Sequence, residues 1–165
     1  MSDTVRDDQL HLQQLVSNAQ LAMFTSTTSD GKHVSRPMAL QESEFDGDLW
    51  FFAYEDSAVV AQVRAEPEVN VSFTDNSNSS WTSIAGRAEV VHDREKAEDL
   101  YGPALKIWFP DGPATPGLTL IKVHADSAQY WEGPSSTIGK VAGGIRALVT
   151  RSPEKDPFKH KSIDL

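Results

Sequence analysis

The chain of 165 residues contains no cysteine, and its 15 basic residues are outnumbered by 24 acidic ones. The lack of cysteine excludes disulfides, thiolate catalysis and Cys-ligated metals. The formal net charge of -9 disfavours nucleic-acid binding, because that binding depends on a basic face that neutralises phosphates. No apolar run is long enough to cross a bilayer, and the polar, acidic residues 1–8 do not resemble a signal peptide. We therefore expect a soluble, cytoplasmic protein without nucleic-acid or membrane partners.

Metal sites, nucleotide loops and nucleophilic triads are also missing from the sequence pattern. The five histidines are scattered without the spacing of metal ligands. Gly139 and Lys140 superficially resemble a phosphate loop, but the spacing is one residue too long, and Val141 stands where Ser or Thr would bind magnesium. Triads assemble in space rather than in sequence, and nothing here flags one. We therefore name no metal ligand and no catalytic residue.

What the chain does contain is a series of strand patterns joined by short turns. Strands are expected at residues 21–27, 34–42, 49–53, 69–74, 81–91 and 118–131. Helices are expected at about residues 3–18, 58–64, 93–101 and 103–108, and more weakly at 141–149. Most turns are too short for crossover helices and no G-x-G-x-x-G follows a strand, which argues against a Rossmann fold. The pattern predicts a mainly β protein with a closed antiparallel sheet of six strands, a bulge or close approach at Gly86, and a bend at Asp126 and Ser127.

The second and third predicted strands contain the first candidate for a binding site. Pro37 cannot donate a ladder hydrogen bond, so it belongs at a sheet edge or a bulge. Arg36 beside it is then an anion-binding candidate, because a guanidinium lies next to free backbone groups. A solvated surface arginine on an ordinary hairpin is the alternative from these residues alone.

Two further features favour a ligand with an anionic end and a planar ring. The helix expected after Ser57 would present free amides at its N-terminus, which bind phosphate by geometry and dipole; a simply capped helix is the alternative. Trp108 and Trp131 stand at the ends of elements, where a ring can flank a planar ligand or lie in a dimer interface. Trp50 and Trp81 lie within strands and are expected in the core.

The order and spacing of these segments resemble the pyridoxamine-phosphate-oxidase-like, FMN-binding split barrels over about residues 8–150. The segments that carry the resemblance are 35–38, 49–53, 57–73 and 83–89, and segments 108–113 and 127–131 resemble the bacterial general stress protein branch. The resemblance implies a flavin-binding split-barrel domain over residues 8–150, in a homodimer that holds FMN in the clefts at the subunit interface. Residues 151–165 are expected to form a flexible C-terminal tail.

The resemblance also implies cofactor-binding roles for individual residues. Arg36 matches the phosphate-binding arginine. The other matching positions are Pro37 and Met38 against the ring, Phe51, Phe52 and Ala53 beneath the ring and the ribityl chain, Ser57 and Ala58 at the phosphate turn, and Trp131 from the partner subunit with Trp108 nearby. Many relatives have a lysine where this chain has Val59. The loss of that charge implies weaker FMN binding, or FAD in place of FMN.

Three functions remain open from the sequence. The first is a flavin-dependent oxidoreductase of unknown substrate, in which the flavin carries hydride or electrons and the protein supplies position and electrostatics. The second is a non-catalytic flavin carrier or stress-response binding protein, since no acid–base pair can be named. The third is a dimeric interaction module without flavin.

Overall fold

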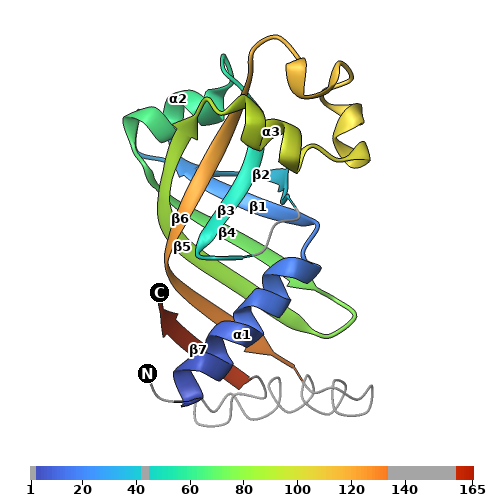
Figure 1. The fold of residues 1–165 in the computed structure, drawn as a ribbon. Helices are drawn as coiled ribbons and strands as arrows, with labels where there is room; N and C mark the ends of the chain where they lie inside the picture. The colour runs from blue at the N-terminus through green and yellow to red at the C-terminus, as the bar shows by residue number, and fades with distance from the viewer. Residues whose placement is uncertain (1–2, 42–44, 134–158) are drawn as a thin grey trace.

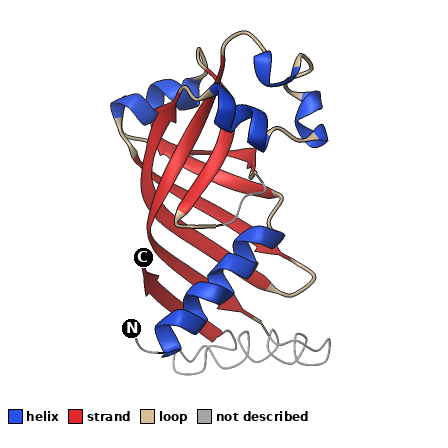
Figure 2. Cartoon of the chain, viewed as in Figure 1, coloured by secondary structure: helices blue, strands red, loops and turns tan. Residues whose placement is uncertain are grey.

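The computed structural model describes residues 3–41, 45–133 and 159–165 as a curved antiparallel sheet with helices at its two ends (Figures 1 and 2). In chain order the elements are α1 (Asp3–Asn18), β1 (Leu21–Thr27), β2 (His33–Ala39), β3 (Asp48–Tyr54), α2 (Ala58–Ala65), β4 (Glu68–Asp75), β5 (Ser80–Val91), α3 (Arg94–Leu100), the 3₁₀ helices η1 (Pro103–Ile107) and η2 (Gly112–Ala114), β6 (Leu118–Glu132) and β7 (Lys159–Asp164). None of the helices in these ranges is long and apolar enough to cross a membrane. The helix predicted at 141–149 lies outside the described residues.

The six predicted strands form the barrel. They pair in the order β2-β1-β4-β5-β6-β3, and every pairing is antiparallel. The two outer strands meet where the amide of Gln41, just after β2, donates to the carbonyl of Trp50 in β3 at 3.3 Å. The predicted mainly β, antiparallel barrel fold is confirmed. The second strand ends at Ala39 rather than at residue 42.

Every second side chain along the strands points inward, and these side chains fill the barrel interior. In β1, Ala22 and Phe24 are buried while Leu21 and Met23 are exposed, because successive side chains point to opposite faces. Phe24 packs edge to face on Phe51 of β3, with ring centroids 5.3 Å apart. Other fully buried residues of the same core are Leu12, Val60, Val71, Ile84, Ile121 and Val123.

A bulge separates the two halves of β6, which pair with different strands on one edge. The register between β5 and β6 shifts between Ala85 and Gly86, so Asp126 of β6 has no partner on β5. A Cβ on Gly86 would lie only 2.3 Å from the carbonyl oxygen of His124, so the backbones approach too closely for any side chain. On its other edge, β6 pairs with β3 before the bulge and with β7 after it. The predicted bulge at Gly86 and bend at Asp126 are confirmed.

The lower end of the barrel in Figure 1 is covered by α1 and β7. Leu12 of α1 is fully buried in the main core. Asp8 of α1 forms an ion pair with Lys161 of β7, with 2.8 Å between Oδ2 and Nζ, and this contact raises the pKa of Lys161. The helix therefore packs on both the barrel core and the last strand.

The prediction of a flexible tail at residues 151–165 is wrong for its last part. Lys159–Asp164 form β7, which pairs with the end of β6. Ile163 is buried in the core, whereas its neighbours are polar or charged and gave no strand pattern. The folded domain therefore extends past residue 150, and the rest of the predicted tail lies outside the described residues.

The upper end carries α2, α3, η1 and η2 (Figure 1). A second apolar cluster joins β3 and β6 to α3 and η1, and it consists mainly of Phe52, Ala97, Leu100, Leu105, Phe109 and Leu120. The predicted cap of α3 is confirmed, because the Asp93 carboxylate accepts from the amide of Lys96 at 2.9 Å. This cluster holds η1 beside the ends of β2 and β3.

Candidate functional site

A cavity of about 440 Å³ opens between β2, β3, the start of α2 and η1. This volume lies within the range of small-molecule and cofactor sites. The lining residues are Leu21, Arg36, Pro37, Met38, Ala39, Gln41, Phe52, Ala53, Tyr54, Ser57, Val59, Leu105, Trp108 and Phe109. The fold thus brings together most of the cofactor-binding residues expected from the sequence.

Arg36 supplies the positive charge of the cavity. Its Nη1 donates to the hydroxyl of Ser26 at 2.6 Å, and its Nη2 donates to the side-chain oxygen of Gln62 at 2.8 Å. Within the described ranges no carboxylate forms an ion pair with it. Partial burial lowers the pKa of the Arg36 guanidinium from its ordinary value. The charge is partly removed from water and lacks a counter-ion, which makes it an attractive site for an anion.

Ser57 supplies a second polar group at the same cavity. It is the N-cap residue of α2, yet its side chain makes no capping hydrogen bond. The hydroxyl oxygen is buried and has no hydrogen-bond partner in the described part of the chain. The first amides of α2 have no intrahelical acceptor, as at any helix N-terminus. A hydroxyl, free amides and the nearby guanidinium are the donors that a phosphate group requires.

Val59 follows these donors but adds no charge. Its side chain is buried in the main core, although it also lines the cavity. Within the described ranges, Arg36 is the only charged residue that lines this cavity.

The rest of the cavity wall is apolar and aromatic. Pro37 lies on β2, which ends the hydrogen-bonded strand path, so its missing amide hydrogen costs little. Met38, Phe52 and Leu105 line the wall, and Trp108 lies beside them at the end of η1. The hydroxyl of Tyr54 donates to the carbonyl of Trp108 at 2.7 Å and ties η1 to β3. This wall suits a flat, largely apolar ring.

Three residues named from the sequence do not line this cavity. Phe51 points into the core, because neighbouring side chains of β3 face opposite sides and Phe52 takes the cavity side. Ala58 is exposed at the start of α2. Trp131 lies on β6 beside β7 and stacks on His160 with ring centroids 5.0 Å apart. The contact expected of Trp131 across a subunit interface stays a prediction.

Sequence reasoning missed other residues of the site. Gln62 and Ser26 hold Arg36, and Leu21, Gln41 and Tyr54 line the cavity. Gln62 lies one turn and a half after Ser57, which is the only signal that could have directed attention to it. Ser26 is an inward-facing polar residue in an apolar strand, a pattern that marks a buried polar contact.

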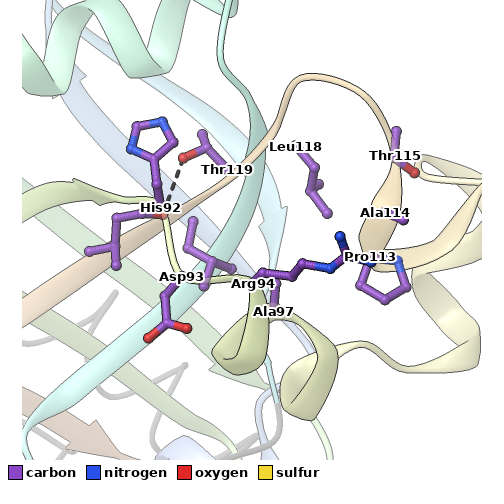
Figure 3. Close-up of a pocket in the computed structure, with 11 residues that line it drawn as sticks. His92, Asp93, Arg94, Ala97, Pro113, Ala114, Thr115, Leu118 and Thr119 are labelled. Carbon is purple, nitrogen blue, oxygen red and sulfur yellow. Dashed lines mark hydrogen bonds between the residues drawn. The ribbon is translucent and has the colours of Figure 1, made fainter.

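A second cavity of about 290 Å³ lies between α3, η2 and the start of β6 (Figure 3). Its charged groups already have partners: Arg94 pairs with Glu98 at 3.0 Å and the Asp93 carboxylate caps α3. The Thr119 hydroxyl donates to the carbonyl of Val91, the contact dashed in Figure 3. Nothing at this cavity calls for a ligand. In the described portions of the chain, moreover, no cluster of His, Asp and Glu could hold a metal ion.

Comparison with known proteins identifies the class to which this barrel and cavity belong. A model of the pyridoxamine 5'-phosphate oxidase-like family matches residues 7–155, and the chain belongs to this family. The protein bli-3 of Neurospora crassa is 31% identical over 148 residues, which cover 84% of this chain and 71% of that protein.

Solved structures show the same fold. The general stress FMN/FAD binding protein of Xanthomonas citri is 26% identical, with a TM-score of 0.68 over 79% of this chain and 92% of that chain. A Clostridium acetobutylicum protein related to general stress protein 26 of B. subtilis has a TM-score of 0.67 at 18% identity, covering 76% of this chain and 89% of that chain. At 18% identity the second likeness concerns the fold alone.

Proposed function

We propose that this chain is a flavin-binding protein of the general stress type, with FMN in the cavity between β2, β3, α2 and η1. The observation that carries the proposal is one cavity that combines an apolar wall with two polar groups. These are the Arg36 guanidinium, which has no carboxylate partner among the described residues, and the Ser57 hydroxyl, which has no hydrogen-bond partner among them. A cofactor with an anionic tail and a flat ring has that same division. The 26% identical relative from Xanthomonas citri is described as binding FMN or FAD.

The residues present fit the parts of such a cofactor. Arg36, Ser57 and the first amides of α2 would hold the phosphate, and the wall beside Met38 and Phe52 would hold the ring. Because Val59 leaves Arg36 as the only lining cation, we expect FMN to bind less tightly than it would with a second cation. FAD is the alternative cofactor, and competition between FMN and FAD decides which is preferred.

We further propose that the bound protein acts as a flavin-dependent oxidoreductase. The flavin supplies hydride or electron transfer when bound. Among the described residues that line the cavity there is no His, Asp, Glu or Lys, and the Tyr54 hydroxyl already donates to a carbonyl. The chain's own side chains would therefore bind and orient the cofactor and exclude water from its ring, while proton transfer would involve solvent or the substrate.

A homodimer with flavin at the subunit interface is part of the same proposal. Large apolar side chains are exposed around the cavity: Ile107 is 81% exposed, Trp108 52% and Leu21 56%. Large apolar side chains exposed beside a cavity are found at interfaces in many proteins. Analytical ultracentrifugation tests this point, and a monomer across the working concentration range contradicts it.

The direct test of flavin binding is titration with FMN of the wild type and Arg36→Ala. Loss of one charge-assisted contact is expected to weaken FMN binding roughly ten- to a hundredfold. The fold should persist, because Ser26 and Gln62 still hydrogen-bond to each other at 2.6 Å. Arg87→Ala is the matched control, since Arg87 pairs with Glu68 on the barrel surface and does not line the cavity. Equal FMN affinity in the wild type and Arg36→Ala contradicts the proposal.

The lack of an acid or base in the cavity also favours a second function, a non-catalytic flavin carrier or stress-response binding protein. Anaerobic mixing of the flavin-loaded protein with NADH or NADPH separates the two. Reduction of the flavin followed by turnover with an acceptor supports the oxidoreductase, and failure of every donor to reduce it supports the carrier.

A further inference from the structure

Arg36 is held by neutral oxygen atoms from two other elements. The Ser26 hydroxyl of β1, whose residue is only 1% exposed, accepts from Nη1 at 2.6 Å. The Gln62 side chain of α2 accepts from Nη2 at 2.8 Å and also from the Ser26 hydroxyl at 2.6 Å. These three contacts fix the guanidinium against the barrel wall and the helix that starts at Ser57.

The chemistry of the donors determines how this network is oriented. A guanidinium only donates, so Gln62 must turn its amide oxygen toward Arg36. The Ser26 hydroxyl accepts a hydrogen bond from Arg36 and donates one to Gln62, so the donor and the acceptor of each hydrogen bond in the network are defined. The network therefore orients Arg36 without placing a negative charge beside it.

Other arginines of the chain are held differently. Arg64, on the same helix as Gln62, pairs with Glu55, and Arg94 pairs with Glu98. In those pairs the carboxylate both orients and neutralises the guanidinium. At Arg36 only the orientation is supplied, and the charge remains for another group.

We propose that Gln62 and Ser26 are positioning residues that hold the Arg36 guanidinium toward the cavity by neutral acceptors, so that its charge stays available for the phosphate of the ligand. This inference rests on the proposed flavin site and extends it to residues that do not line the cavity. It also makes Gln62 a specificity residue, since its lack of charge favours an anionic cofactor over an uncharged one.

The test is Gln62→Glu, which keeps the shape and the two accepted hydrogen bonds but adds a counter-ion to Arg36. FMN affinity is expected to fall by about tenfold or more, the loss of a charge-assisted contact. The affinity for riboflavin, which lacks the phosphate, is expected to stay unchanged, and the melting temperature should not fall. Gln14→Glu, at an exposed position of α1, is the control for the added charge and should match the wild type.

A purely structural role for Gln62 would give a different pattern. If Gln62→Glu has wild-type FMN affinity and wild-type stability, or loses FMN and riboflavin affinity equally, the inference is overturned. Ser26→Ala, which removes one acceptor but adds no charge, should weaken FMN binding less than Gln62→Glu does.

Inorganic phosphate separates this inference from the proposed function. Should the wild type bind neither flavin yet bind phosphate, with binding lost in Gln62→Glu, the flavin proposal fails and the role of Gln62 stands. If the wild type binds neither flavins nor phosphate, both fail.

Discussion

The two ends of the barrel differ in whether their charged side chains have charged partners. At the lower end, charged groups of α1 pair with the last two strands: Asp8 bonds to Lys161 of β7, and His11 bonds to Glu132 of β6 at 3.0 Å. At the upper end, Arg36 lacks a counter-ion in the described chain and the buried Ser57 hydroxyl lacks a partner. The larger cavity, of about 440 Å³, lies at the upper end, which we call the open end. The lower end has a smaller cavity of about 240 Å³ beside α1 and Leu165.

We therefore assign the lower end to the stability of the fold and the upper end to the proposed binding of the ligand. A buried polar group without a partner costs about 1–3 kcal/mol. At the lower end the cost falls on the Thr82 hydroxyl of β5, opposite Tyr130, while α1 buries Leu12 in the core. The open end bears the cost at Ser57, and a ligand that accepts a hydrogen bond there would recover it.

The largest expected effect concerns the core beneath α1 at the lower end. Leu12→Ala should lower the free energy of unfolding by about 3 kcal/mol, because Leu12 is fully buried and its removal leaves a cavity. Leu10→Ala is the control on the same helix, where the side chain is 52% exposed and the change should be small. Denaturant unfolding measures both. FMN affinity at low temperature should be unchanged in each, and a specific loss in Leu12→Ala would contradict the division between the ends.

A smaller effect concerns the open end alone. Ser57→Ala should weaken FMN binding by about tenfold while leaving the ligand-free stability no lower than that of the wild type, because no capping hydrogen bond is lost. Thr82→Val is the matched control. Thr82 carries the other buried hydroxyl without a partner among the described residues, but it does not line the cavity. It should gain stability and keep its FMN affinity, as calorimetry and titration can show.

The smallest effect concerns the pH dependence of the upper end. Arg64 first, and then His92, lower the pKa of Glu55 from its ordinary value of 4.5. A lowered pKa in the fold means that Glu55 contributes stability above its ordinary pKa and loses it as the pH falls through the folded value. Glu55→Gln should therefore melt below the wild type at about pH 7, and the difference should shrink as the pH falls below the ordinary pKa of Glu55. A constant difference in melting temperature across that range would show that the Glu55 charge is not responsible.

Features set by neighbouring residues were predictable from the sequence. The bounds of β1, the Asp93 cap and the bulge at Gly86 follow from alternation, a side-chain acceptor before a helix and the lack of a Cβ. The aromatic strand β3 was also expected, but alternation alone did not say whether Phe51 or Phe52 faces the cavity. The curvature of the barrel decides that, and it places Phe51 in the core.

Features set by distant residues were not predictable. β7 is a strand because β6 offers it a free edge after the bulge, and among residues 160–164, whose side chains are described, only Ile163 is buried in the core. Gln62 bonds to Arg36 because α2 packs on β1, within reach of the Arg36 side chain, and no local pattern reveals this. The proposed phosphate-binding end of the site was therefore predictable only in part, through Arg36 and Ser57.

The most direct test of this account compares the affinity of the wild type for FMN and for riboflavin, measured by titration under the same conditions. A grip on the phosphate by Arg36, Ser57 and the start of α2 predicts that FMN binds at least about tenfold more tightly. Equal affinities for the two flavins would show that the phosphate is not held, and would contradict the role of the open end.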